Sequence, residues 1–500
     1  MKPVLEDSAD FVIVGSGAGG ATAARVLSHA GHSVIVLEEG PDLQPAQRAR
    51  GLLAAMDESM RDMATVATSG STPIPLLMGR CVGGSTAINS GIIWRIPEDV
   101  QAIWRAQHGL ADLLEPSALV RCFEDIERDL GVEPVREAVL GGNAQRLRAG
   151  ALALGLPGSV IRRNAARCQG TNRCLQGCPN GARQSMDVSY IPDAVRHGAR
   201  VHALVRAERV SIRDGRAQAV LGQRLDPISR KPVGAVHIHA RRAVIAAAGA
   251  VFTPLLLWRS GLRGRVGLGF QAHPGVAVVG RFPDAVRMGF GATQAYEVPL
   301  RERGFKLESL ALPPELLATR IPGAGADWQE QLANLDHFAQ FCAVHRARAV
   351  GSVRPSWFGG SNVRYNLTAQ DLERVKQSVA LVVRIMFAAG ADEVYPGVAN
   401  VPERMTSESQ AQLIESARIQ RRDFHLLASH HFGSAAAGSD PRHSVVAQTL
   451  QTHAVRGLYV MDASALPTNL GVNPQHTIMA VVQRAAEWLA NSKRELSSAA

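Results

Sequence analysis

The pattern of apolar and polar residues near the start of the chain predicts a strand, a helix and a second strand. An apolar run from Phe11 to Val14 is followed by glycines and then by helical spacing from Ala21 to Ala30. A second apolar run extends from Ser33 to Leu37. Two strands joined by a helix are typical of a doubly wound parallel sheet with helices on both faces, so we expect an α/β protein.

The middle of the chain predicts elements of both kinds. Residues 112–130 have helical spacing with mixed charge, and strand-like segments fill 200–245 with a turn at Asp214-Gly215. Residues 158–187 are rich in Gly, Asn, Arg and Cys, which predicts a long functional loop.

The last part of the chain predicts two helices. The first covers 368–389, with Thr368 or Asn366 as the N-terminal cap and Gly390 as the stop signal. The second runs from Thr477 to Leu489.

The first apolar run leads directly into a dinucleotide-binding motif. Gly15, Gly17 and Gly20, with Ser16 between the first two, would provide a tight turn, access for a pyrophosphate and close packing of helix on strand. Glu38 ends the second strand, where a carboxylate can accept hydrogen bonds from a ribose. FAD and NAD both satisfy this pattern.

Composition excludes several classes of protein. Of 500 residues, 46% are hydrophobic and 20% charged, which argues against disorder. The net charge is +10, but the basic residues are mostly arginines spread along the chain, and aromatic residues make up only 5%. We therefore expect no nucleic-acid partner.

Membrane insertion is not expected either. The longest charge-free apolar run, Ala243 to Trp258, has 16 residues and includes Gly249 and Pro254, which is too short for a span. Residues 1–10 do not resemble a signal peptide, so we expect a cytoplasmic protein. Periplasmic export with a signal-bearing partner is the alternative.

Four segments together resemble the glucose–methanol–choline (GMC) family of FAD-dependent oxidoreductases over almost the whole chain. They are the glycine loop with Glu38, residues 79–95 (GRCVGGSTAINSGIIWR), residues 249–261, and the C-terminal motifs at 430–434 (HHFGS) and 458–477. The resemblance implies a Rossmann-like FAD-binding domain and a substrate domain with a mostly antiparallel sheet. The expected FAD-binding domain comprises 8–110, 186–270 and 428–495; the expected substrate domain comprises 111–185 and 271–427, including the cysteine loop 167–183.

The resemblance also implies which residues bind FAD. Relatives with covalent flavin have a histidine immediately before the signature asparagine, whereas this chain has Ile88 before Asn89, so we expect non-covalent FAD. The expected cofactor-binding residues are Gly15, Ser16, Gly17, Gly20, Glu38, Gly83, Gly84, Asn89, Gly249, Asp462, Ala463, Asn473 and Pro474.

Oxidation of an alcohol removes a hydride from carbon and a proton from oxygen, and histidine is a suited proton acceptor. By resemblance, His430 matches the family's catalytic base, and Asn473 matches the asparagine that orients the substrate hydroxyl. His431 and His476 are the alternatives for the base.

Three cysteines form a cluster with the spacing Cys168-x5-Cys174-x3-Cys178-Pro179. Closely spaced thiolates on a glycine-rich loop are typical of iron–sulfur sites, and three ligands suit a 3Fe-4S cluster. The spacing resembles that of bacterial FAD-dependent sugar dehydrogenases, but also cysteine loops of long-chain-alcohol and sterol oxidase-like members without a cluster. A structural loop, a disulfide, or a zinc site completed by His197 or His202 are the alternatives.

We therefore expect an FAD-dependent alcohol dehydrogenase or oxidase, with an apolar, aromatic, long-chain or sterol-type alcohol favoured as substrate. The electron acceptor (cytochrome, quinone or oxygen) and an accessory subunit stay open. The alternatives are an iron–sulfur sugar dehydrogenase subunit, a non-redox lyase or decarboxylase of this fold, and an electron-transfer subunit without turnover.

Overall fold

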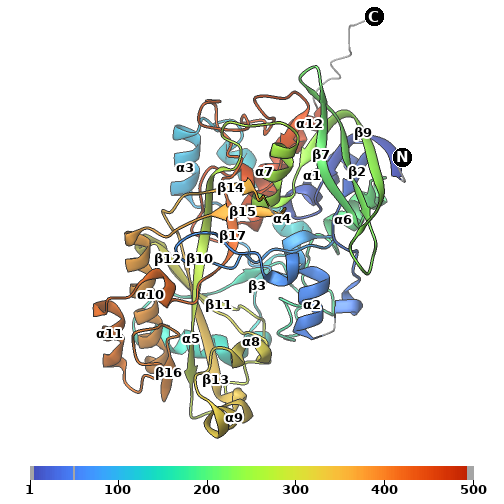
Figure 1. Ribbon diagram of the computed structural model, residues 1–500. Helices are drawn as coiled ribbons and strands as arrows, with labels where there is room; N and C mark the ends of the chain where they lie inside the picture. The colour runs from blue at the N-terminus through green and yellow to red at the C-terminus, as the bar shows by residue number, and fades with distance from the viewer. Residues whose placement is uncertain (1–4, 49–50, 358, 492–500) are drawn as a thin grey trace, which may run out of the picture.

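The computed structural model describes residues 5–48, 51–357 and 359–491. Residues 492–495 of the expected FAD-binding domain lie outside this range. The described residues form two large sheets, each with its own layer of helices, and Figure 1 shows them one above the other. The long strand β10 (Leu268–Arg281) runs between the two regions in this view.

The first sheet contains the predicted strand–helix–strand unit. Its strand order is β6-β2-β1-β9-β8-β7, and β18 pairs with the end of β9. The strands β6, β2, β1, β9 and β18 are parallel, whereas β7 and β8 are antiparallel to their neighbours. Their bounds are β1 (Leu5–Val14), β2 (Val34–Leu37), β6 (Arg200–His202), β7 (Val205–Arg213), β8 (Arg216–Leu225), β9 (Pro232–Ala246) and β18 (Leu458–Val460).

The antiparallel part of this sheet is a hairpin added to the predicted doubly wound unit. Strands β7 and β8 are joined by the tight turn at Asp214-Gly215, whose φ angles are 52° and 70°. Two residues with positive φ form the hairpin turn that matches the twist of two antiparallel strands. The turn reverses the chain, so β7 and β8 pair antiparallel.

Helices cover the first sheet. Helix α1 (Ala18–His29) packs against α12 (Gln475–Asn491) and α6 (Tyr190–Arg196), and α12 also packs against α4 (Pro116–Asp129). We expected residue 111 to begin the substrate domain, yet the apolar face of α4 joins the core of the first sheet. Leu119, Phe123 and Ile126 are buried there, because α4 has one apolar stripe and the first sheet's helices cover it.

The second sheet is antiparallel, as expected for the substrate domain. Its order is β15-β14-β10-β13-β12-β11-β4, and β16 and β17 also pair with β10. Apart from β10, the strands are β4 (Ser159–Val160), β11 (Tyr296–Leu300), β12 (Phe305–Ser309), β13 (Phe338–His345), β14 (Gly351–Pro355), β15 (Ser361–Arg364), β16 (Glu393–Tyr395) and β17 (Leu427–Phe432). A separate two-stranded ladder joins β3 (Glu133–Pro134) and β5 (Arg162–Arg163).

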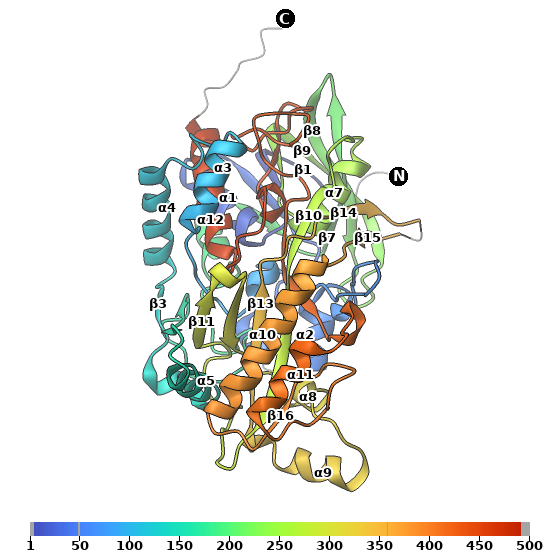
Figure 2. The ribbon, with the colours of Figure 1, turned by 90° about the vertical axis from the view of Figure 1, so that its left-hand side faces the viewer.

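The predicted long helix covers one face of this second sheet. Helix α10 (Ala369–Ala388) begins with a capping box, in which the Thr368 hydroxyl accepts from the Asp371 N–H at 3.1 Å. Gly390 follows its end with a φ of 89°. Figure 2 shows α10 lying across the strands, and His345 of β13 contacts Ser378 of α10 at 2.8 Å. Because strand side chains alternate, residues 340, 342 and 344 face away from α10.

The remaining helices connect these layers. They are α2 (Leu52–Ser59), α3 (Glu98–Gln107), α5 (Gly141–Ala153), α7 (Gly249–Arg259), α8 (Pro314–Ala318), α9 (Gly325–Ala333) and α11 (Ala411–Ser416). Helix α5 packs with α10 on the second sheet, and α7 contacts β7 and β14, which belong to different sheets. Within the described residues no helix is long and apolar enough to cross a bilayer.

Candidate functional site

The turn between β1 and α1 has the geometry that the glycine motif predicts. Gly15 has a φ of 102°, and a Cβ there would lie 2.3 Å from the carbonyl oxygen of Ala247. Gly17 lies at the N-terminal end of α1 and lines a cavity, and nothing lies within 4 Å of where its Cβ would be. Open space at the start of a helix is what the pyrophosphate of a dinucleotide requires.

Glu38 lies immediately after β2 and lines the same cavity. Its Oε2 accepts from the Ser16 hydroxyl at 2.6 Å and the Ser16 N–H at 3.1 Å, and its Oε1 accepts from the Gly40 N–H at 2.9 Å. Burial raises the pKa of Glu38 above its usual value, although these hydrogen bonds oppose the effect. Oε2 therefore already accepts two hydrogen bonds, whereas Oε1 has capacity for a further one, such as one from a ribose hydroxyl.

The cavity has a volume of about 1230 Å³ and is lined by residues of both sheets. This exceeds the roughly 300–1,000 Å³ of most small-ligand pockets, so a dinucleotide and a substrate can share it. Of the expected cofactor-binding residues, the lining includes Gly15, Ser16, Gly17, Glu38, Gly84, Asn89, Gly249, Asp462, Ala463, Asn473 and Pro474.

The two other expected residues, Gly20 and Gly83, lie behind this lining. A Cβ on Gly20 would lie 1.9 Å from the Gly15 carbonyl oxygen, so Gly20 allows helix and strand to pack closely. The Gly83 N–H donates to the Ser16 hydroxyl at 3.0 Å and so supports the glycine turn from the side.

Asp462 joins separate parts of the cofactor end. Its carboxylate accepts from the Gly249 N–H at 2.8 Å and the Thr253 hydroxyl at 2.5 Å, and it caps the short turn that begins at Ala463. Burial raises the pKa of Asp462, and these donors oppose that effect. The side chain thus fixes the start of α7 beside β18.

The residues expected to act on the alcohol lie on the lining of the same cavity. His430 comes from β17 and Asn473 from the loop before α12. His430 Nδ1 lies 3.2 Å from Nδ1 of His273 on β10. His273 also lines the cavity. Burial, aided by the positive charge of Lys306, lowers the pKa of His430 to about 3, so the ring is neutral near pH 7.

The hydrogen-bond partners of His273 determine which ring nitrogen of His273, and which of His430, carries the proton. The Gly471 N–H donates to His273 Nε2 at 2.9 Å, so this nitrogen carries no proton. Burial also lowers the pKa of His273 well below its usual value, and the neutral ring therefore has its proton on Nδ1, facing His430. Neutral His430 then accepts at Nδ1 and carries its own proton on Nε2.

The two alternative bases are placed differently. His431 lines the cavity, but its Nε2 contacts the carbonyl of Ala428 at 3.1 Å. His476 is fully buried at the start of α12, where its ring packs against Phe123, and it is not among the cavity-lining residues. Geometry therefore favours His430 over His476.

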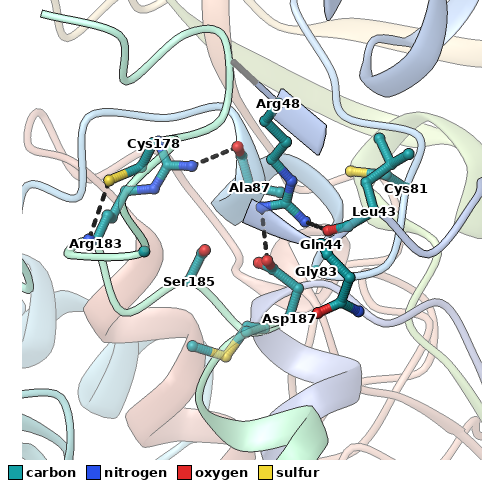
Figure 3. Close-up of polar contacts among 12 residues, drawn as sticks. Leu43, Gln44, Arg48, Cys81, Gly83, Ala87, Cys178, Arg183, Ser185 and Asp187 are labelled. Carbon is teal, nitrogen blue, oxygen red and sulfur yellow. Dashed lines mark hydrogen bonds and ion pairs between the residues drawn. The ribbon is translucent and has the colours of Figure 1, made fainter. Parts of the chain in front are cut away.

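Two buried arginines anchor the cysteine loop. Nη2 of Arg163 donates to Cys174 Sγ at 3.0 Å, and the backbone N–H of Arg183 donates to Cys178 Sγ at 3.3 Å. The Arg183 guanidinium also donates to the carbonyls of Cys174, at 2.7 Å, and of Ala87. Figure 3 shows Arg183 between the loop and Ala87. The loop is therefore tied to the segment 83–91 at the cofactor end.

This geometry gives no support to a single-ion site, such as a zinc site, at Cys168, Cys174 and Cys178. Their sulfur atoms do not all lie within 4.8 Å of one another, as the ligand atoms of one bound ion would, and all three are free thiols. The 3Fe-4S cluster, in which each thiolate binds a different iron, stays a prediction. Burial alone would raise the pKa of Cys174, but the arginine charges lower it to about 7. Of the two suggested zinc ligands, His197 stacks on the ring of His29. The other, His202, has its Nε2 3.7 Å from Oδ2 of Asp7.

Sequence reasoning missed His273 and Lys306. Nothing in the sequence around His273 distinguishes a histidine that contacts the base, and Lys306 looks like an ordinary strand residue. Both are almost completely buried, with exposed fractions of 1% each. A lysine amid apolar strand residues was the only available signal.

Comparison with known proteins identifies the family. The GMC oxidoreductase N-terminal family model matches residues 9–275, and the C-terminal model matches residues 358–481. The chain therefore belongs to the GMC oxidoreductases, which confirms the resemblance inferred from its motifs. It is an oxidoreductase with the family's α/β fold, and the family supports FAD as the cofactor.

Among the similar proteins is a GMC-type oxidoreductase of Mycobacterium tuberculosis, described as uncharacterized, at 37% identity over 96% of this chain and 75% of that one. A long-chain-alcohol oxidase of Arabidopsis thaliana is 29% identical over 96% of this chain and 68% of that one. Formate oxidase of Aspergillus oryzae has a similar structure, with a TM-score of 0.73, 15% identity and coverage of 97% and 98% of the two chains. At that identity the likeness shows the fold alone.

Proposed function

We propose that this protein oxidises the CH–OH group of an alcohol to an aldehyde or ketone with non-covalently bound FAD. The observation that carries the proposal is that His430 and Asn473 open onto the same cavity as Gly17 and Glu38. We assign the region of the first sheet to FAD and the second sheet to the substrate. The named activity of the plant relative, a long-chain-alcohol oxidase, supports this class of reaction.

FAD, when bound, supplies the hydride acceptor, N5 of the flavin. Gly17 and the N-terminus of α1 would hold its pyrophosphate, Glu38 its ribose, and Asn89, Asp462 and Pro474 would lie along the rest. His430 Nε2 and the Asn473 amide would bind the substrate hydroxyl and hold it in one orientation.

Removal of the hydroxyl proton places a condition on His430. Its Nε2 can accept a proton only when His430 carries its own proton on Nδ1, directed at His273. The bond from the Gly471 N–H favours the opposite tautomer at rest. We therefore propose that the pair exchanges tautomers before the reaction, after which the hydroxyl proton moves to Nε2 and the hydride leaves carbon.

The lining of the substrate end favours an alcohol with an apolar body. Leu310, Leu312, Leu316 and Leu427 line the cavity around the second sheet. Burial of a methylene group contributes about 0.8 kcal/mol, so such a wall favours long-chain or sterol-type alcohols over sugars. We assign the cysteine loop a structural role, because its arginines connect it to the cofactor segment.

The test is to purify the protein with its flavin and mix it anaerobically with long-chain, sterol, aryl and sugar alcohols. We expect bleaching of the flavin absorbance by an apolar alcohol and no iron in the preparation. A flavin that no alcohol bleaches would exclude the proposal and favour a lyase, a decarboxylase or an electron-transfer subunit. Reoxidation by oxygen, a quinone or a cytochrome would then identify the acceptor and any need for an accessory subunit.

A further inference from the structure

Lys306 is a buried cation next to the alcohol site. It lies on β12, and its side chain is 1% exposed. Its ammonium group contacts Glu308 Oε1 at 2.5 Å, Glu297 Oε2 at 2.9 Å and Asn473 Oδ1 at 2.6 Å. The contacts with Glu297 and Asn473 are hydrogen bonds and the contact with Glu308 is an ion pair, so three groups hold the ammonium in one position.

This contact determines the orientation of the Asn473 amide. Its Oδ1 accepts from Lys306, so the amide NH₂ is the polar group that remains for the cavity. Within the described part of the chain, the Asn473 NH₂ donates no hydrogen bond, and the hydrogen bond of this side chain is the one that Oδ1 accepts from Lys306. An amide whose oxygen was not held could turn over and present an acceptor to the substrate.

The two carboxylates are held in turn. Glu308 Oε2 accepts from Gln294 at 2.5 Å, and Glu297 Oε2 accepts from the indole N–H of Trp94 at 3.1 Å. Burial would lower the pKa of Lys306, but Glu297 and Glu308 outweigh this effect and raise it, so the lysine is charged at neutral pH. The cation thus rests on a frame that spans β11 and β12.

We propose that Lys306 is a positioning residue of the alcohol site, which directs the NH₂ of Asn473 toward the substrate oxygen. The inference rests on the proposed function and extends it to a residue that does not itself line the cavity. A donor fixed in advance stabilises negative charge as it develops on oxygen, without rearrangement during the reaction.

The charge of Lys306 also acts on His430. The titratable side chains that face His430 are Lys306 from β12, His273 from β10 and His431 from its own strand. Lys306 carries a full positive charge, which adds to burial in lowering the pKa of His430. Removing this charge should raise that pKa and move the acid limb of the reaction to higher pH.

The experiment compares Lys306→Met with the wild type, as full-length proteins loaded with FAD. Single-turnover reduction of the flavin by alcohol should be slowed by about tenfold to a hundredfold, less than the loss of a whole donor. Its acid limb should move to higher pH, whereas a purely structural role would leave the limb in place. Lys376→Met is the matched control, because Lys376 is also buried, pairs with Glu373 and lies outside the cavity lining.

A double variant tests whether Lys306 acts through Asn473. If it does, Lys306→Met combined with Asn473→Ala should reduce flavin no more slowly than Asn473→Ala alone. Calorimetric titration with trifluoroethanol, an alcohol that resists hydride loss, should show weaker binding to Lys306→Met than to the wild type. The single variant Asn473→Ala and the double variant should bind trifluoroethanol equally. Losses that multiply, or a Lys306→Met protein equal to wild type, would overturn the inference.

Loss of the lysine leaves two buried carboxylates without a cation, which can prevent folding. In that case the triple variant Lys306→Met, Glu297→Gln, Glu308→Gln replaces the charged set by a neutral one, and the same measurements apply. The two proposals fail separately. A wild-type flavin that no alcohol reduces overturns the proposed function, whereas normal reduction by the Lys306 variants overturns only the role of Lys306.

Discussion

The two ends of the cavity are built in different ways. At the nucleotide end, backbone groups of one short segment, from Gly15 to Gly19, form the turn that would hold the pyrophosphate. At the alcohol end, side chains from four separate strands and loops meet, including His273, Lys306, His430 and Asn473. The first end is therefore determined locally, and the second depends on how the sheets are assembled. Substitutions should separate these two cases.

The largest effect is expected for His430→Ala. Loss of a general base costs about 10²–10⁴ in rate, so flavin reduction should nearly stop while FAD remains bound. Stopped-flow reduction and the flavin content of the purified variant measure the two effects. His431→Ala is the comparison, and a larger loss there would move the base to His431.

At the other end, Gly17→Val should weaken FAD binding by about a hundredfold, because its Cβ and methyl groups would fill space left open for the cofactor. The protein should fold normally, since nothing lies within 4 Å of that position. Titration of the apoprotein with FAD gives the affinity. Gly289→Val, at an exposed position with equally open space, should bind FAD like the wild type.

A smaller effect is expected for Glu38→Gln. The amide keeps an acceptor but loses the charge, so FAD affinity should fall about tenfold. The same titration measures it, with Glu39→Gln as the neighbouring control. If both variants bind FAD equally, Glu38 serves the Ser16 turn rather than the ribose.

The pH dependence of flavin reduction tests the alcohol end of the cavity without a substitution. His430 acts as a base only when neutral, and its pKa is lowered to about 3, so this group causes no loss of flavin reduction between pH 8 and 5. Activity dependent on it is lost only as pH falls through about 3. Single-turnover rates over this range check the expectation, and an inflection near pH 6.5 would show that the base lies in a more solvated position than the structure gives.

The smallest effect is expected for Cys174→Ser. The hydroxyl can still accept from Arg163, so FAD content and flavin reduction should change less than twofold, and iron should be absent from both proteins. Iron analysis of the wild type tests whether the cysteine loop holds an iron–sulfur cluster. About three irons per chain, as a 3Fe-4S cluster requires, would overturn the structural role of the loop.

Much of the fold followed from local sequence signals. The strand–glycine–helix unit, the long helix after Thr368 and the last helix were predicted close to their observed bounds, because each has a cap, a stop or an uninterrupted apolar pattern. The antiparallel pairing of β7 with β8 and the packing of α4 on the first sheet were not predicted. Strand direction and the partner of an amphipathic helix depend on residues distant in sequence, which periodicity does not identify.

The sequence by itself predicted a dinucleotide site, where its glycine turn lies, and which histidine and asparagine are candidates for the chemistry. Those properties reside in short segments whose backbone geometry and residue types are local. Only the tertiary structure decided that His430 faces His273, that Lys306 holds Asn473, and that Arg163 donates to Cys174. Each of these pairs joins residues 11 to 167 positions apart, so the folding of the two sheets, rather than any local pattern, brings them together.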